Sequence, residues 1–268
     1  MSVAEAAPLH AALDLEKVVN FRDFGGHVGA DGRRVARGRL YRSGHFGRAT
    51  PEDMARIGEL GVSMVVDLRR IAEREREPSP WPQPFAGRVL EHGGPHDPVV
   101  APHLAYLTQD GLTPDDVAER LSGSYRRHPF DAHYAALFRS YFDALSDIEG
   151  AVLIHCHAGK DRTGMLAALT LHALGVAYDD IVDDFLATNL YSRVEKNLRA
   201  RLRDFERDNG RPVDEALMWR MLGVERGYID AMCAEMVQRH GSVDAYLEEA
   251  MGVTPAVRER LRDRFLER

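Results

Sequence analysis

The chain has 268 residues, of which 44% are hydrophobic and 29% are charged, a composition typical of a globular protein. At this length, one large core or two small ones can bury about three quarters of the unfolded surface. The formal net charge of -7 argues against nucleic acid as a partner of the whole surface, although a small basic pocket is compatible with it. Every apolar run is broken well before the roughly 18 residues that a membrane span needs, so no membrane helix is predicted.

The N-terminus lacks both a positively charged region and a continuous apolar core, so it does not resemble a secretory signal. The two cysteines, Cys156 and Cys233, form no CxxC pair and are too few for a disulfide framework. We therefore expect a reducing, cytoplasmic setting; export by a route without a recognisable signal is compatible with the same sequence. Cys233 falls on an amphipathic pattern over 225–239, which predicts a core position.

Strand and helix signals alternate along the first part of the chain, which predicts an α/β fold with a central, mostly parallel sheet flanked by helices. Residues 20–43 contain two glycine-rich turns and short apolar stretches typical of small strands. Thr50-Pro51-Glu52-Asp53 predicts a capped helix that ends at Gly61. The apolar run over 62–68 predicts a strand covered on both faces, with Asp67 at its carboxyl end, where ligands of such sheets gather.

Residues 69–77 form a charge run that is most simply a solvated helical turn, and 78–84 form a breaker segment. The next stretch, 93–130, is rich in Pro, Gly and His and has two weak helical patterns, near Leu104 and after Thr113. Such long excursions are often lids, so this one is predicted to be an insertion that covers part of the molecule.

Asp131 is predicted to cap a helix whose apolar positions continue to Leu145 at 3.6-residue spacing. A buried strand over 151–154, a polar turn and a helix ending at Gly175 follow. The remainder, 176–268, is predicted to be helical throughout. We expect a single domain over 1–268, with the lid insertion at 93–130 and a helical C-terminal region.

The turn over residues 155–164 reads HCHAGKDRTG. A strand that leads through a turn into a helix places several backbone N–H groups and the positive helix end at one point, which favours anion binding. A Walker phosphate loop requires a glycine where Ile154 stands and Ser or Thr where Asp161 stands. The nucleotide-binding interpretation therefore fails.

A second interpretation rests on Cys156 and on Arg162, six positions later. The N–H groups and dipole that bind an anion also lower a thiol pKa from about 8.5, which favours an ionised nucleophile. The planar Arg162 fork suits two oxygens of a phosphoryl group, and Thr163 is placed to donate its hydroxyl to the thiolate. His155 and His157 are not expected to bind metal, because no cluster of zinc-ligand spacing accompanies them in the sequence. His155 is instead expected to fix the loop by hydrogen bonding.

The string HCxAGKDRTG resembles the protein-tyrosine-phosphatase superfamily, and in particular its branch of bacterial tyrosine/serine and lipid phosphatases. The segments NFRDFGG from Asn20, LYRSG from Leu40 and VVDLR from Val65 are also similar to that branch. The resemblance implies hydrolysis of phosphomonoesters through a phosphocysteine intermediate, with no metal or other cofactor, on a sheet flanked by helices. The implied substrate is a phosphorylated protein, with phosphotyrosine first and phosphoserine, phosphothreonine or a phosphoinositide as further classes.

The resemblance also assigns roles. Cys156 is the expected nucleophile, and Asp161 is the first candidate for the general acid. Asp67 is the second candidate, or else orients Arg162. Many tyrosine phosphatases carry this acid on a WPD loop, but here Gln83 follows Trp81-Pro82. Lys160 is expected to add a positive charge at the rim of the site. The residues expected to bind the phosphoryl group are His157, Ala158, Gly159, Lys160, Asp161 and Arg162.

Supporting roles remain open for residues outside the loop. Three of them are candidate braces of the site or mere turn-forming residues: Asn20, Arg22 and Asp23. Arg42 and Arg69 are either braces or surface ion pairs. The acidic cluster over 179–184 is expected to be solvated at a helix start. Two other function classes remain alternatives for this chain: a sulfurtransferase with a persulfide on Cys156, and a non-catalytic phosphate-binding module.

Overall fold

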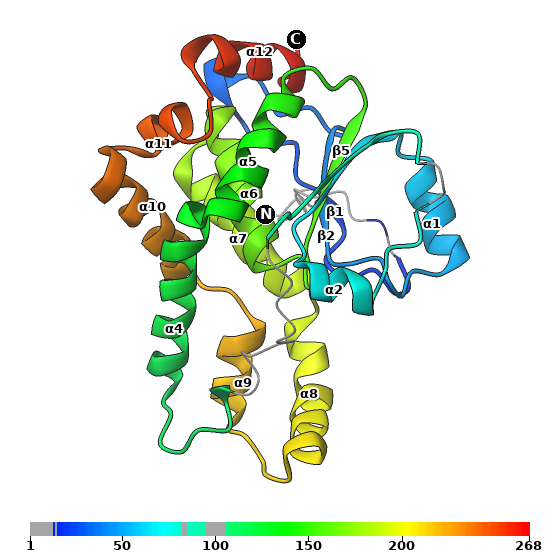
Figure 1. Ribbon diagram of the computed structural model, residues 1–268, viewed down its shortest axis with the longest axis vertical. Coiled ribbons are helices and arrows are strands. Elements are labelled where there is room, and N and C mark those ends of the chain that lie inside the picture. The colour runs from blue at the N-terminus through cyan, green and yellow to red at the C-terminus, as the bar shows by residue number, and fades with distance from the viewer. Residues whose placement is uncertain (1–12, 14, 82–84, 95–105) are drawn as a thin grey trace, which may run out of the picture.

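The computed structural model describes residues 13, 15–81, 85–94 and 106–268. A five-stranded sheet lies at the centre (Figure 1), with the strand order β1-β2-β5-β3-β4. The first pair is antiparallel and the other pairs are parallel. The strands are β1 (Arg22–Asp23), β2 (Leu40–Ser43), β3 (Val62–Asp67), β4 (Arg88–Glu91) and β5 (Ala151–His155). Together with the flanking helices, this confirms the predicted class of a mostly parallel sheet between helices.

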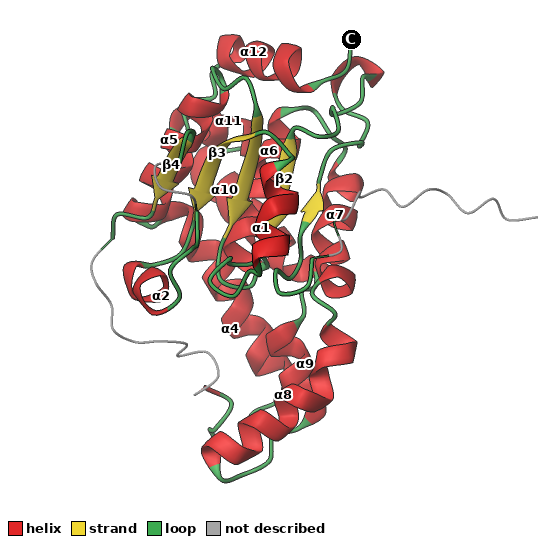
Figure 2. Ribbon diagram, turned by 90° about the vertical axis from the view of Figure 1, so that its right-hand side faces the viewer, coloured by secondary structure: helices red, strands yellow, loops and turns green. Residues whose placement is uncertain are grey.

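Helices cover both faces of the sheet (Figure 2): α1 (Pro51–Gly58) lies on one, and α5 (Ala132–Leu145) and α6 (Asp161–Ala173) lie on the other. The position of strand β5 between two apolar clusters explains why its sequence is apolar without alternation. Val152 and Ile154 point into the large core with α5 and α6, whereas Leu153 packs with the smaller cluster on the α1 face. A central parallel strand must satisfy two apolar environments at once.

Three helices lie beyond the carboxyl edge of the sheet (Figures 1 and 2): α4 (Pro114–Arg127), α8 (Val194–Asn209) and α9 (Glu215–Leu222). Although Tyr125 of α4 belongs to the large core, apolar side chains from all three helices form a cluster separate from those at the sheet. Its buried members are Leu107, Val117, Leu198, Phe205, Leu217, Met218 and Met221. The edge of the sheet that carries the cysteine loop therefore faces a separate group of helices.

The C-terminal region is helical, as predicted. The remaining helices are α2 (Ile71–Arg76), α7 (Tyr178–Tyr191), α10 (Arg226–His240), α11 (Val243–Glu249) and α12 (Pro255–Phe265), with short 3-10 helices at Ala30–Gly32 and His128–Phe130. Within the described ranges, no helix combines the length and the apolar character needed to cross a bilayer.

Local signals in the sequence predicted most of the helices and strands. Thr50 caps α1 in a capping box with Asp53, and Asp131 caps α5. Strand β4 was not predicted, and Val28 and Val35 form only isolated bridges. The helical pattern near Leu104 and residues 82–84 lie outside the described part of the chain.

Candidate active site

The cysteine loop connects β5 to α6 at the carboxyl edge of the sheet, and Cys156 is 2% exposed. Gly159 shows how closely the loop packs on the neighbouring strand. Its φ is +68°, and a Cβ atom there would lie 2.4 Å from the carbonyl carbon and oxygen of Ser43 at the end of β2. Only glycine fits both the backbone conformation and the space. The first turn of α6 follows directly, so its backbone N–H groups lie beside the loop.

A buried polar network holds the loop from behind. Asn20 Nδ2 donates to the Gly159 carbonyl at 2.5 Å, and Arg42 Nη2 donates to the same oxygen at 3.3 Å. Arg22 donates to the side-chain oxygen of Asn20. Arg42 and Arg22 also pair with Asp184 of α7, at 2.5 and 3.4 Å. Because both arginines are fully buried, the shared carboxylate is needed to offset their charge.

This network decides several of the open assignments. Asn20, Arg22 and Arg42 brace the loop, whereas Asp23 accepts hydrogen bonds from the N–H groups of Gly25 and Gly38 and so shapes a turn. The prediction of a wholly solvated acidic cluster on α7 was wrong at one position, because Asp184 is 1% exposed. It is the residue of that cluster that faces the two arginines.

Arg162 is held by a residue that the sequence did not single out. Its Nη1 and Nη2 atoms donate to the two carboxylate oxygens of Glu73 at 2.6 and 2.8 Å, and Nη1 also donates to the Leu68 carbonyl at 3.0 Å. Burial alone would raise the pKa of Glu73, but the paired guanidinium outweighs it and holds that pKa well below its ordinary value. The charge run over 69–77 is therefore not simply solvated, since Glu73 is 6% exposed.

Asp67 lies at the carboxyl end of β3 but faces a different partner from the one expected. Arg69 Nη2 and Nε donate to its carboxylate at 2.7 to 3.1 Å, and His155 Nε2 lies 3.7 Å away. Burial would raise the pKa of Asp67, but His155 and Arg69 together lower it. Arg69 thus forms a buried pair, not a surface one, and the residue that orients Arg162 is Glu73, not Asp67.

His155 and Thr163 lie on either side of the loop, and both are fully buried. Burial lowers the pKa of His155 to about 4, so its ring is neutral at pH 7 and packs edge-on against Phe46. The Thr163 hydroxyl, in the first turn of α6, has no hydrogen-bond partner among the described residues.

Asp161 is the first residue of α6, and its side chain is 36% exposed. The buried Tyr125 hydroxyl from α4 donates to its Oδ1 atom at 2.9 Å. Burial, followed by the adjacent Asp161 carboxylate, raises the pKa of Tyr125 well above its ordinary value, so this hydroxyl remains a donor. Part of the predicted insertion thus contacts the cysteine loop directly.

Lys160 does not lie where the sequence placed it. Its Nζ atom donates to the backbone carbonyls of Met221 at 2.7 Å and Gly223 at 3.2 Å, and the residue is 6% exposed. The last carbonyls of a helix carry partial negative charge, and here α9 presents them to the ammonium group. The expected cation at the rim is therefore a buried link between the loop and α9.

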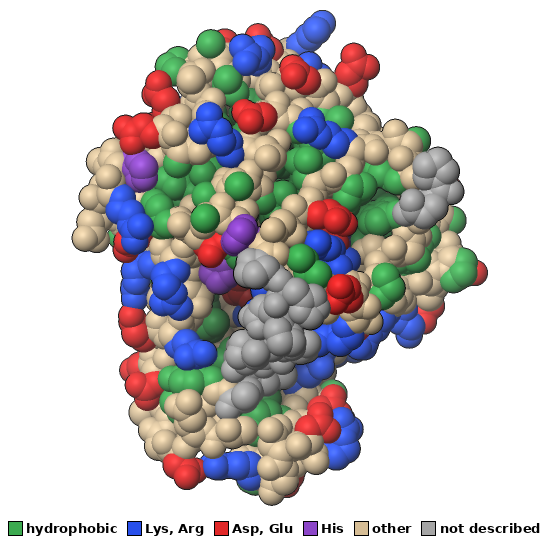
Figure 3. All heavy atoms as spheres, viewed as in Figure 1, with side chains coloured by type: hydrophobic (Ala, Val, Ile, Leu, Met, Phe, Trp, Pro, Cys, Tyr) green, Lys and Arg blue, Asp and Glu red, His purple; other side chains and the backbone are tan. Residues whose placement is uncertain are grey.

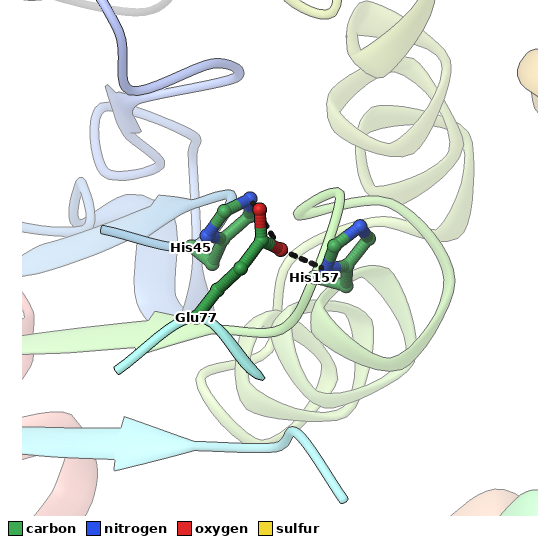
Figure 4. Close-up of side chains that lie close together, drawn as sticks. All are labelled: His45, Glu77 and His157. Atoms are coloured by element: carbon green, nitrogen blue, oxygen red, sulfur yellow. Dashed lines mark ion pairs between the residues drawn. The ribbon is translucent and has the colours of Figure 1, made fainter. Parts of the chain in front are cut away.

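At the mouth of the loop, His157 stacks on His45, with 4.7 Å between ring centroids and 5° between ring planes. Glu77 places Oε2 3.5 Å from His45 Nε2 and 3.6 Å from His157 Nδ1 (Figure 4). Burial and the neighbouring His45 lower the pKa of His157 to about 4. Neither Glu77 nor His45 was a candidate in the sequence, because they lie far from the loop along the chain.

Comparison with known proteins agrees with this geometry. A model of a tyrosine phosphatase family matches residues 13–267. A Cupriavidus necator protein named "Putative tyrosine-protein phosphatase" is 36% identical, over 91% of this chain and 85% of its own length. The triple specificity protein phosphatase PtpB of Mycobacterium tuberculosis is 30% identical, over 94% of this chain and 98% of its own length. The cysteine and arginine lie six positions apart in a loop between a buried strand and a helix. The chain that carries this loop thus belongs to the tyrosine phosphatase family.

Proposed function

We propose that the protein hydrolyses phosphomonoesters through a phosphocysteine intermediate, with Cys156 as the nucleophile. The observation that carries the proposal is the way Glu73 holds Arg162. The bonds to Glu73 and Leu68 use both protons of Nη1 and one proton of Nη2. Neither of these partners uses Nε–H or the second Nη2–H, the two donors along the edge of a guanidinium that suits two oxygens of a phosphoryl group.

The chemical steps follow from these positions. The Cys156 thiolate attacks phosphorus while Arg162 and the N–H groups of the loop stabilise the equatorial oxygens. The buried Thr163 hydroxyl, which has no acceptor among the described residues, supports a role as donor to the thiolate. The phosphorus–sulfur bond forms as the bond to the leaving oxygen breaks. Water then attacks the phosphocysteine and releases phosphate and the free thiolate.

Asp161 is the proposed general acid. It is partly exposed at the start of α6, and both Tyr125 and Lys160 Nζ, at 2.9 and 3.6 Å, lie at its Oδ1 atom, so Oδ2 is left to carry a proton. The same carboxylate takes up a proton from water in the second step. Asp67 is less suited to this role, because its pairing with Arg69 favours the ionised form.

The proposed substrate class is protein phosphotyrosine. The name of the Mycobacterium tuberculosis relative, which credits that protein with triple specificity, makes phosphoserine and phosphothreonine peptides the first alternatives to compare. Figure 3 shows acidic and basic side chains interspersed over one face of the molecule. Together with the net charge of -7, this favours recognition by the pocket itself over attraction to a basic surface.

The nucleophile is tested with Cys156→Ser. The purified protein should hydrolyse para-nitrophenyl phosphate in the presence of a chelator, and the variant should lose at least about a thousandfold in kcat while it still binds inorganic phosphate in calorimetry. Cys233→Ser is the matched control and should keep its activity. Undiminished turnover in Cys156→Ser would contradict the mechanism. Persulfide transfer would appear as thiosulfate-dependent activity instead, and a binding module would show no turnover.

The general acid is tested with Asp161→Asn. Its kcat should fall about a hundredfold or more on alkyl phosphates, whose leaving oxygen needs a proton, and much less on para-nitrophenyl phosphate. Asp67→Asn is the comparison. The same leaving-group dependence in Asp67→Asn, and its absence in Asp161→Asn, would reverse the assignment.

A further inference from the structure

His45, Glu77 and His157 bring three metal-binding side chains together at the mouth of the cysteine loop. They come from three separate places in the chain: just after β2, just after α2, and the loop itself. One donor atom of each lies within 4.8 Å of the others. In Figure 4 the Glu77 carboxylate points toward both imidazoles. The two rings lie side by side and nearly parallel.

The contacts inside the cluster are too long to be its full explanation. Glu77 Oε2 lies 3.5 and 3.6 Å from the two ring nitrogens, at or beyond the limit of a hydrogen bond. His157 Nδ1 is buried and has no hydrogen-bond partner among the described residues. Meanwhile Arg48 Nε and Nη2 hold the other oxygen, Oε1, at 2.9 and 2.8 Å. The carboxylate is thus fixed with Oε2 left toward the imidazoles.

These separations match the edges of a zinc coordination shell. With zinc–ligand bonds of 2.0 to 2.2 Å, two ligands of a tetrahedral site lie about 3.3 Å apart. Two histidines and one carboxylate with an open fourth position are a donor set that Zn²⁺ binds in proteins. Arg48 would act as an outer partner that orients the ligating carboxylate. We propose that His45, Glu77 and His157 form a binding site for Zn²⁺ or a similar divalent transition metal.

The hydrogen bond of His45 indicates how firmly the metal is held. Gly47 N–H donates to His45 Nδ1 at 3.2 Å, so the ring proton sits on Nε2, which faces Glu77. When a metal takes Nε2, the proton moves to Nδ1 and the bond from Gly47 is lost. Loss of this bond opposes metal binding, so we expect this site to bind zinc more weakly than a structural zinc site with four ligands.

The site lies next to the proposed nucleophile, because His157 directly follows Cys156. We expect a metal ion on His157, with water in its open position, to obstruct the approach of a phosphate ester to Cys156. Zinc should therefore inhibit hydrolysis by blocking this entrance. This consequence rests on the proposed function, whereas metal binding itself does not.

Metal binding is measured first without the thiol, which is itself a zinc ligand. Cys156→Ser should bind one Zn²⁺ per chain in calorimetry, and Co²⁺ should give the visible absorption of a tetrahedral site. In that background, Glu77→Gln and His157→Phe should each weaken zinc binding at least about tenfold. Glu75→Gln, two residues earlier in α2, and His133→Phe are matched controls and should bind as before. Circular dichroism melting curves establish that each variant is folded. Equal zinc affinity in Glu77→Gln and Glu75→Gln would overturn the site.

Inhibition is measured next, with Cys156 intact. Zinc should inhibit hydrolysis of para-nitrophenyl phosphate, and EDTA should restore it. Glu77→Gln should raise the inhibitory zinc concentration at least about tenfold, whereas Glu75→Gln should not. Identical inhibition of both variants would overturn the entrance role. A protein without turnover in EDTA would instead contradict the proposed function, and zinc binding to Cys156→Ser would still decide whether the metal site exists.

Discussion

At the scale of single residues, Glu73 links the first turn of α2 to Arg162 of the cysteine loop. Its side chain accepts the N–H of Arg70 at 2.8 Å, which caps the helix, and it also accepts both ends of the Arg162 fork. One carboxylate therefore fixes the start of α2 and the orientation of Arg162, the proposed phosphate-binding residue. A bidentate pair of this kind adds geometric precision as well as energy.

Glu73→Gln should impair catalysis without removing any group that touches the phosphoryl oxygens. The amide can accept from only one arm of Arg162 and turns an N–H₂ toward the other, so the fork loses its alignment. We expect kcat to fall about tenfold to a hundredfold, with a smaller change in KM. Glu75→Gln is the control. A proportional loss of folded protein, with normal kcat per active molecule, would reduce Glu73 to a structural role.

The same variant has a predicted signature in pH-dependent stability. Because the pKa of Glu73 is lowered in the folded protein, the ionised form stabilises the fold above the unfolded value of about 4.3, and this contribution is lost as the pH falls toward the folded value. Unfolding by urea should therefore separate the native protein from Glu73→Gln at pH 7, with a smaller difference below pH 4. A difference that grows on acidification would contradict this account of the pair.

At the scale of elements, α4 reaches the cysteine loop through one polar side chain, and α9 reaches it through the backbone carbonyls at its end. Tyr125 of α4 donates to Asp161, and the carbonyls at the end of α9 receive the ammonium of Lys160. Helix α9 packs with both α8 and α4 in the apolar cluster beyond the sheet, and α4 also packs along α10. The geometry of the loop therefore depends on helices that lie outside the sheet and its two covering layers.

Lys160→Met should measure the link to α9. The variant keeps the length of the side chain but removes the donor, which leaves the Met221 and Gly223 carbonyls without it and costs about 1 to 3 kcal/mol of unfolding free energy. We expect similar fractional losses of activity on para-nitrophenyl phosphate and on phosphoinositides. Lys196→Met, on the exposed face of α8, should be neutral. A loss confined to phosphoinositides would restore the role at the rim that the sequence suggested.

At the scale of the whole molecule, the sequence predicted contiguous features well. The capped helices α1 and α5, the apolar strands β3 and β5 and the HCxAGKDRTG turn all depend on neighbours in the chain, so their signals are local. Strand β4 was not predicted, because it is a short edge strand whose residues are mostly exposed and whose sequence contains no apolar run.

The sequence predicted the part of the site that is contiguous in the chain, which is the cysteine loop, but not the partners from distant segments. The roles of Glu73, Glu77 and Asp184 depend on partners supplied by distant segments, and in sequence each stands within a charged cluster that reads as solvated. Lys160 was misplaced for the same reason, because nothing near the loop reveals that the end of α9 approaches it. Which charge in a cluster is buried is decided by tertiary packing and not by local pattern.

The contact between Lys160 and the end of α9 also has a consequence for how the chain folds during its synthesis. The cysteine loop is synthesised well before the carbonyls of Met221 and Gly223 that receive its lysine, and its braces at Asn20 and Arg42 are made much earlier. Contacts so distant along the chain form slowly, because long loops must close first. A nascent chain that ends before α9 therefore contains the complete loop sequence but not its complete set of supports. We therefore expect the loop to gain its complete set of supports late in folding, after most of the polypeptide has been synthesised.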